Sequence, residues 1–327
     1  MYLYEYFKDK KIYCITDTDL DGVSSHLLTR FYIQPIAFEY YYTLTGDRQM
    51  TEFEDKYCDK SDIIIFIDLA PTLDLYNQLI EKNKEIFIFD HHETHWIELG
   101  ELIPNDHYFY STEYCASKVF FDEITKGKRI GKCIYQYVEL VNIYDTWQQQ
   151  SYLWNDAKKL QDIMWEYVNW LDVDLTNNNR NDFFVNKQLE KIDKGKYFYF
   201  TQFEERLYAK AKQKEERNLK DAKRSLQIRI DNSGNKYAYF ECTSKMSIIA
   251  NILLNENPDL IYIAGHPTFP ELYRNTPNGM VSLRSRDGFR VNQIAEIYGG
   301  GGHYQAAGVD LGVELFKKFK MGEIHLI

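Results

Sequence analysis

The sequence predicts an α/β protein of two domains, the larger built on a doubly wound, mostly parallel sheet. Over residues 1–150, short apolar segments alternate with helical patterns, as in chains that form parallel sheets covered by helices. A different strand pattern begins after residue 226, and 327 residues suffice for two ordinary domains with real cores. We therefore expect a first domain over 1–184, a linker helix over 185–226 and a smaller α/β domain over 227–327.

The elements of the first half follow from apolar runs and helical periodicity. We expect helices to connect the strands and a helical, Trp-rich segment to follow over 150–185. The Asn-rich run at 176–181 predicts a surface loop. The expected strands lie near 11–16, 36–43, 62–68, 85–90 and 106–110, and the expected helices near 21–32, 72–82, 113–125 and 132–144.

The second half begins with a long segment of mixed charge. Its helical spacing over 185–226 is typical of a solvated face, so we assign it no chemistry. Two alternating segments around the turn at 232–235 then indicate a hairpin. A helix over 247–254 and strands over 260–264 and 280–284 complete the predicted domain, which ends in a glycine-rich motif.

Composition and charge exclude several classes of protein. A net charge of −10 argues against a protein that coats long nucleic acid through a basic surface. The apolar runs are too short to cross a bilayer, and the first residues lack the layout of a secretion signal, so we expect a cytoplasmic protein. The five scattered cysteines are typical of free thiols and not of a disulfide framework.

Carboxylates follow three of the predicted strands. The first strand leads into Asp17, Asp19 and Asp21, another ends at Asp68, and a third ends at Asp90, followed by two histidines. Ligand sites in open α/β sheets lie at the carboxyl ends of the strands. One such Asp usually caps a helix or forms a turn, but three strand ends with adjacent histidines predict a metal site. A calcium loop fits poorly because the twelfth position carries no Glu.

The histidines and one further carboxylate complete this predicted site. His91 and His92 are adjacent on extended backbone and point to opposite sides, so one can bind metal while the other faces a substrate. Asp145 ends another apolar segment and adds a carboxylate. Carboxylate and imidazole ligands suit ions of the Mn/Mg class. We interpret His95 and His26 as surface or supporting residues.

A second motif predicts a phosphate site. Four glycines precede His303, and consecutive backbone N–H groups without side chains can surround an anion. Arg284 lies on the preceding predicted strand, and arginine is the preferred bidentate partner of phosphate. A flexible surface loop is the alternative interpretation of the glycines. The expected substrate contacts are Ser282, Arg284, Gly300, Gly301, Gly302 and His303.

In this order, the motifs resemble the DHH phosphoesterase superfamily, with a DHHA1 domain in the second half. The resemblance covers essentially the whole chain, from Asp17-Thr18-Asp19 to the glycine–histidine motif. It implies a phosphodiesterase with two Mn²⁺ ions, for which Mg²⁺ or Co²⁺ could substitute. The implied metal ligands are Asp17, Asp19, Asp68, His91 and Asp145.

The resemblance also implies roles for the residues beside the metal. Asp90 would orient the histidines, and His92 would face the scissile phosphate as a general acid or an electrostatic stabiliser. Arg284, the glycines and His303 would hold another phosphate of the substrate. Some branches carry a His four residues before the first Asp, where this chain has Tyr13, which favours the Asp-x-Asp-x-Asp-Gly branch.

Within the superfamily, the motifs around Asp19 and Asp145 look most similar to the nanoRNase branch of NrnB-like oligoribonucleases. The resemblance then implies hydrolysis of short RNA to mononucleotides. The alternatives are an enzyme for cyclic dinucleotides, their linear products or 3′,5′-bisphosphorylated nucleosides, and a RecJ-like single-strand DNA exonuclease. A catalytically inactive nucleotide-binding protein is the non-enzymatic alternative. A homodimer is also left open.

Overall fold

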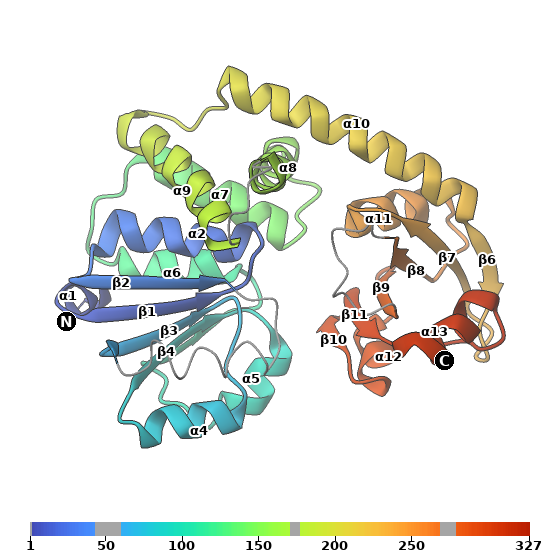
Figure 1. Cartoon of the computed structure of the whole chain (residues 1–327), viewed down its shortest axis with the longest axis horizontal. Helices are drawn as coiled ribbons and strands as arrows, with labels where there is room; N and C mark the ends of the chain where they lie inside the picture. Colours follow the sequence, from blue (N-terminus) through green and yellow to red (C-terminus); the bar gives the residue numbers. More distant parts are fainter. Residues whose placement is uncertain (1, 43–59, 171–176, 269–278) are drawn as a thin grey trace. The chain divides into compact units, whose positions relative to one another are not determined.

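The computed structural model describes residues 2–42, 60–170, 177–268 and 279–327. Cys58 and the last residue of the strand predicted at 36–43 lie outside these ranges. Two compact units are present, over Met1–Ala209 and Lys210–Ile327 (Figure 1). The boundary falls within helix α10 (Gln202–Ser225). The predicted division into catalytic domain, linker and substrate domain stays a prediction.

The first unit contains the predicted parallel sheet. All described neighbours in it are parallel, in the order β2-β1-β3-β4-β5. This order reverses direction between β1 and β3, which is where ligands bind in such sheets. The predicted fold class is therefore confirmed. The strands are β1 (Lys11–Thr16), β2 (Ala37–Tyr42), β3 (Ile63–Ile67), β4 (Glu85–Asp90) and β5 (Tyr108–Tyr110).

Helices cover both faces of this sheet, as Figure 1 shows. One face packs against a large apolar cluster that includes Phe120, Val141 and Leu160. The other face packs against Leu75, Leu79 and their neighbours. The first face is covered mainly by α2 (Leu20–Leu28), α6 (Ala116–Ile124), α7 (Lys132–Asp145), α8 (Trp154–Trp170) and α9 (Asn177–Lys194), and the second by α4 (Leu73–Glu81) and α5 (Glu93–Leu99).

Several predicted elements differ from those observed. The Asn-rich run, expected to be a loop, begins α9 at Asn177. The single linker helix expected over 185–226 is the end of α9 followed by α10. The chain turns between them because Thr201 and Glu204 form a capping box that starts a new helix, with Thr201 N–H donating to Glu204 Oε2 at 2.7 Å. The helix predicted near 21–32 is α2 followed by the π-helical turn η1 (Thr29–Ile33), and the short helices α1 (Leu3–Lys8) and α5 were not predicted.

The second unit is a smaller α/β unit, as predicted. Its sheet has the order β10-β11-β9-β8-β7-β6, with β7 and β8 parallel and the other described pairs antiparallel. The strands are β6 (Gln227–Ile230), β7 (Lys236–Cys242), β8 (Tyr262–Pro267), β9 (Met280–Ser285), β10 (Gly301–His303) and β11 (Ala306–Asp310), and the helices are α11 (Met246–Glu256), α12 (Val291–Ile297) and α13 (Gly312–Met321).

Within the described residues, no helix has both the length and the apolar character needed to cross a bilayer. The four described cysteines, Cys14, Cys115, Cys133 and Cys242, are buried free thiols.

Candidate functional site

The loop between β1 and α2 carries the first group of carboxylates. Asp19 caps α2, and its Oδ1 accepts a hydrogen bond from the Gly22 N–H at 3.0 Å. A side chain at Gly22 would place its Cβ 2.2 Å from the Asp17 carbonyl oxygen, so only glycine permits this close turn. The loop therefore folds back on the helix and holds Asp17 and Asp19 at the carboxyl end of β1.

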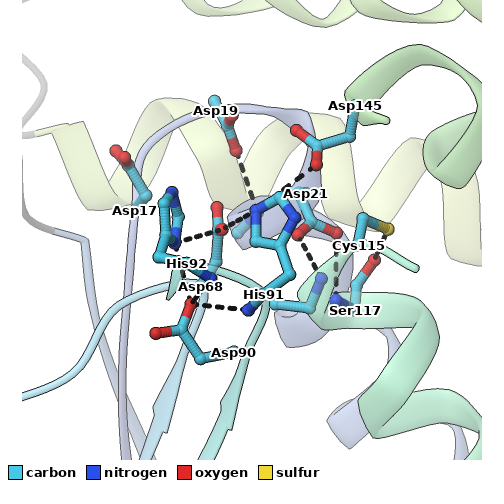
Figure 2. A network of polar contacts seen from close by, with 12 residues as sticks. Asp17, Asp19, Asp21, Asp68, Asp90, His91, His92, Cys115, Ser117 and Asp145 are labelled. Atoms are coloured by element: carbon cyan, nitrogen blue, oxygen red, sulfur yellow. Dashed lines mark hydrogen bonds and ion pairs between the residues drawn. The ribbon is translucent and has the colours of Figure 1, made fainter. Parts of the chain in front are cut away.

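Asp68 follows β3 in an unusual backbone conformation. Its φ of 64° lies in the left-handed region, which Asp tolerates better than most residues. Asp68 Oδ1 lies 3.2 Å from His91 Nε2, and Asp145 Oδ2 lies 3.5 Å from the same nitrogen. The ends of β3, β4 and α7 thus bring three predicted metal ligands together, with the carboxylates of Asp68 and Asp145 both contacting the His91 imidazole (Figure 2).

Asp90 lies behind the two histidines and is completely buried. Its Oδ1 accepts hydrogen bonds from the backbone N–H groups of His91 and His92, at 2.8 and 3.2 Å. The ring Nδ1 atoms of His92 and His95 lie 2.8 Å from Asp90 Oδ1 and 2.6 Å from Asp90 Oδ2, respectively. The carboxylate therefore orients both imidazoles, and His95 has a defined supporting contact.

Asp21 is a member of this cluster that was not among the predicted ligands. One possible set of ligand atoms combines a carboxylate oxygen of Asp21 with Asp68 and His91. A second set combines Asp21 with Cys115 and Asp145. Asp21 also accepts hydrogen bonds from the N–H groups of Ala116 and Ser117 at 2.8 and 3.0 Å, which fixes the first turn of α6 (Figure 2). The sequence could have indicated Asp21 as a ligand, because it is the third Asp of the Asp-x-Asp-x-Asp-Gly motif. An Asp at this position fits a helix cap equally well.

The electrostatics of the cluster favour a bound cation. Burial raises the pKa of Asp17, Asp68 and Asp145, and nearby carboxylates raise the pKa values further. The same two causes raise the pKa of Asp19 to about 7. Several carboxylates that share a buried site repel one another once they ionise. A divalent cation would remove that repulsion.

The histidines have different charge preferences. Burial, with the neighbouring His92, lowers the pKa of His91 to about 4, so its imidazole is neutral and suited to bind metal. Burial alone would lower the pKa of His92, but the Asp90 carboxylate holds it above its ordinary value. The pKa of Asp90 is low despite burial, because His92 and His95 stabilise its charged form.

The residues present fit a metal of the Mn/Mg class. Apart from its 3.5 Å contact with His91 Nε2, Asp145 Oδ2 is buried and accepts no hydrogen bond among the described residues, as expected of a metal-binding oxygen. The donors are carboxylate oxygens and a neutral imidazole, which such ions prefer. We find no thiolate-rich set among the described residues that would favour zinc: the one group that contains a cysteine, Cys115, pairs it with two carboxylates.

In the second unit, the predicted substrate residues lie on β9 and on β10 with the residue before it, and β11 pairs with both strands. Arg284 on β9 pairs with Ala306 on β11, which pairs with His303 on β10. Directly paired residues share one face of a sheet, so Arg284 and His303 lie on the same face. Arg284 donates hydrogen bonds to Ser282 Oγ at 3.1 Å and to Ser247 Oγ. The structure thus brings Ser282, Arg284 and His303 to one face.

The glycine motif also has a structural cause. Gly301 and Gly302 belong to β10, which pairs with β11, so this part of the run is a strand and not a surface loop. A Cβ at Gly300 would lie 2.2 Å from the Gly308 carbonyl oxygen, and one at Gly302 would lie 2.5 Å from the Ala306 oxygen. These glycines therefore permit close approach to β11. An added Cβ at Gly301 would meet nothing within 4 Å.

A DHHA1 domain matches residues 234–320, which contain this sheet and the glycine–histidine motif. Oligoribonuclease NrnB of Bacillus subtilis is 26% identical over 318 residues, which cover 92% of this chain and 73% of NrnB. The second unit thus carries a DHHA1 domain, and the similarity to NrnB extends over most of the chain.

Solved structures of DHH proteins share the fold. RecJ of Thermus thermophilus, solved in complex with Mn²⁺, has a TM-score of 0.57 and 17% identity, covering 98% of this chain and 52% of RecJ. The pGpG-specific phosphodiesterase PggH of Vibrio cholerae has a TM-score of 0.53 and 13% identity, covering 96% of this chain and 97% of PggH. At these identities the likeness shows that the fold is shared, and it does not identify the substrate.

Proposed function

We propose that this DHH/DHHA1 protein is a metal-dependent phosphodiesterase that hydrolyses short oligoribonucleotides to mononucleotides. The observation that carries the proposal is the gathering of Asp68, His91 and Asp145 at the switch point of the parallel sheet. The relationship to oligoribonuclease NrnB, which extends over 92% of the chain, supports the choice of substrate. The net charge of −10 favours a short substrate over a long strand.

The proposed metal ligands are Asp17, Asp19, Asp68, His91 and Asp145, and Asp21 lies among them, close to Asp68 and His91. Two Mn²⁺ ions, when bound, would activate water and stabilise the oxygens of an in-line displacement. Burial and the mutual repulsion of the carboxylates prepare the ligands for these ions. Manganese is the proposed ion because carboxylates and one imidazole form the donor set.

The remaining residues have separate tasks. Asp90 fixes the ring of His92 through Nδ1, so that Nε2 is the atom through which His92 acts on the scissile phosphodiester. Because the Asp90 carboxylate raises the pKa of His92, this imidazole is suited to give a proton to the leaving oxygen. Ser282, Arg284, Gly300, Gly301, Gly302 and His303 are the proposed contacts for another phosphate of the substrate.

The decisive experiment incubates the protein with Mn²⁺ and labelled RNAs from two to about twenty nucleotides long. A cyclic dinucleotide, the linear pGpG and a 3′,5′-bisphosphorylated nucleoside are tested in parallel. We expect fast loss of the shortest RNAs, while long RNA stays intact. Preferential hydrolysis of the cyclic or bisphosphorylated compound would keep the metal site and replace the substrate assignment.

Two variants test the metal site within the same assay. Asp68→Asn keeps the shape of the side chain and tolerates the left-handed backbone, so the fold should survive while activity falls at least about 1,000-fold. Asp74→Asn makes the same charge change on the exposed surface of α4 and should leave activity unchanged. Retained activity in Asp68→Asn would refute the proposed metal site.

A further inference from the structure

Three aromatic rings cluster where α7 ends and α8 begins. Tyr144 stacks on Trp154 with ring centroids 5.7 Å apart and planes inclined by 10°. Trp147 packs edge-on against both, at 5.8 Å from Tyr144 and 5.1 Å from Trp154. All three side chains are only partly buried, so part of this aromatic cluster reaches solvent. Interior packing therefore does not account for the whole of these rings.

Trp147 occupies a backbone position that normally belongs to glycine. The end of α7 is a Schellman motif, in which Gln148 N–H donates to the Ile143 carbonyl at 2.9 Å and Trp147 N–H donates to the Tyr144 carbonyl at 3.1 Å. In this motif the residue after the cap is left-handed, and Trp147 has a φ of 58°. A bulky side chain there strains the backbone, and such strain concentrates at functional sites.

The aromatic cluster is fixed to the candidate metal site through the backbone. Asp145, a proposed metal ligand, lies between Tyr144 and Trp147 in the sequence, so the Cα atoms of Asp145 and Trp147 are at most about 7 Å apart. Asn142 Oδ1, one turn earlier, accepts the Cys115 N–H at 2.9 Å. The next two N–H groups of α6 bind Asp21, so the start of one helix contacts both α7, which leads into the aromatic cluster, and a carboxylate of the candidate metal site.

We propose that this aromatic cluster is the binding site for a nucleobase next to the scissile phosphate. The inference rests on the proposed function and adds a base subsite to it. Aromatic side chains are the general platform on which bases of single-stranded nucleic acids stack. A base is separated from its own phosphate by one sugar, which matches the short distance from Trp147 to Asp145. The exposed amides of Gln149 and Gln150 follow the cluster and suit the polar edge of a base.

A double-mutant cycle between protein and substrate tests this site. The protein change is Trp147→Gly, which suits the left-handed backbone, and the substrate change is an abasic nucleoside at either end of pApA. We expect Trp147→Gly to lower kcat/KM for pApA by about 5- to 150-fold, the range of one base–aromatic stack. For the analogue that lacks the stacked base, the same substitution should change kcat/KM less than about twofold.

Further variants separate stacking from folding. Trp147→Phe keeps a ring and should stay within about fivefold of the wild type. Tyr152→Ala removes a ring of the same connection that is 91% exposed, and should change nothing. Thermal unfolding of each variant measures the structural effect. An equal loss on pApA and on both abasic analogues would mean that the aromatic cluster only holds α7 to α8, and would overturn the proposal.

Calorimetric titration without metal gives a readout that is independent of hydrolysis. In EDTA, pApA should bind the wild type more tightly than Trp147→Gly, and the abasic analogue should bind both equally. If the wild type left pApA intact in Mn²⁺, the proposed function would fail, but this titration would still decide the base site. Equal binding of pApA to both proteins would refute the site.

Discussion

Asp90 shows how one buried carboxylate organises the residues around it. Its two oxygens receive two backbone N–H groups and two histidine rings, and the side chain has no solvent exposure. A buried carboxylate with this many donors has a single allowed orientation. The ring of His92 is consequently fixed, and His95 contributes by holding the second oxygen of Asp90.

We predict that His95→Ala lowers kcat by about 10- to 100-fold, as is typical when a partner of a catalytic group is lost. KM and Mn²⁺ affinity should change little, because His95 contacts Asp90 and the ring of His92, neither of which is a proposed metal ligand. Steady-state kinetics and a metal titration provide the measurement.

The matched control is His107→Ala. Both histidines are 27% exposed, and His107 also binds an aspartate, Asp106, at 2.8 Å, but in another part of the unit. Its removal should leave kcat unchanged. Equal kinetics for the two variants would contradict a positioning role for His95.

His26 gives a prediction for pH dependence. Burial, with nearby Arg30, lowers the pKa of His26 to about 3, so the folded protein keeps this ring neutral where the unfolded chain is protonated. The unfolded state therefore binds the extra proton between about pH 6.5 and pH 3. The stability that depends on neutral His26 is present above pH 6.5 and is lost as pH falls toward 3.

His26→Phe keeps a ring against Tyr40, whose centroid lies 4.2 Å away, but removes the titration. Below pH 6, the free energy of unfolding should fall less steeply with pH in this variant, by up to about 1.4 kcal/mol per pH unit. Urea unfolding from pH 4.5 to 8 measures this slope. The two slopes should coincide above pH 7, and coincidence over the whole range would show that His26 does not titrate as described.

At individual residues, the sequence predicted the carboxylates at the strand ends better than their partners. Asp68 and His91 were recognisable because parallel strands deliver their carboxyl ends to one edge. Asp21 was not, because its contacts to the N–H groups of Ala116 and Ser117 join segments about 95 residues apart. Helical spacing within one segment contains no information about such a contact.

Secondary-structure elements were predictable where one continuous segment carried a long apolar run or a long helical periodicity. The strands that end at Thr16, Ile67 and Asp90 are continuous apolar runs, and α7 lies within one residue of its expected bounds. The start of α10 was missed because its charge pattern continues that of α9. The readable signal was the pair Thr201 and Glu204, which forms a capping box.

Glu204 also links the two helices, and this contact carries a stability prediction. It is fully buried and accepts hydrogen bonds from Lys191 Nζ at 2.8 and 3.0 Å and from Gln188 Nε2 at 2.9 Å. Glu204→Gln would leave the Lys191 ammonium buried without its counter-charge. We expect a loss of about 3 kcal/mol in the free energy of unfolding, measured with urea.

Two further variants make this test specific. Glu190→Gln removes the exposed ion pair with Lys187 and should cost less than about 0.5 kcal/mol. Adding Lys191→Met to Glu204→Gln should recover part of the loss, because no charge then stays buried. If Glu204→Gln cost no more than Glu190→Gln, the buried pair would contribute nothing beyond a surface contact.

At the scale of the whole molecule, the chain has two units with separate apolar cores. The clusters around Phe120 and Leu79 lie in the first unit, and those around Leu283 and Phe240 lie in the second. The proposed metal ligands belong only to the first unit. All five tryptophans, at positions 96, 147, 154, 165 and 170, also lie there. Tryptophan fluorescence therefore reports unfolding of the unit that we propose binds metal.

This distribution yields a prediction for metal removal. A ligand that binds only the folded state stabilises it by mass action, by about 2.7 kcal/mol at one hundred times its Kd. Mn²⁺ should therefore raise the midpoint of the fluorescence transition, and EDTA should reverse the shift. Asp68→Asn should abolish the shift while leaving the metal-free midpoint equal or higher, because removing one carboxylate relieves repulsion in the cluster.

Circular dichroism completes this experiment because it follows the helices and strands of both units. If the units unfold independently, the circular-dichroism change that occurs without a change in tryptophan fluorescence belongs to the second unit. Mn²⁺ should not shift the midpoint of that transition. A metal shift confined to that portion would place the ion outside the proposed site. A shift common to both probes would instead mean that the units unfold as one, since only the first carries the buried carboxylates that a cation relieves.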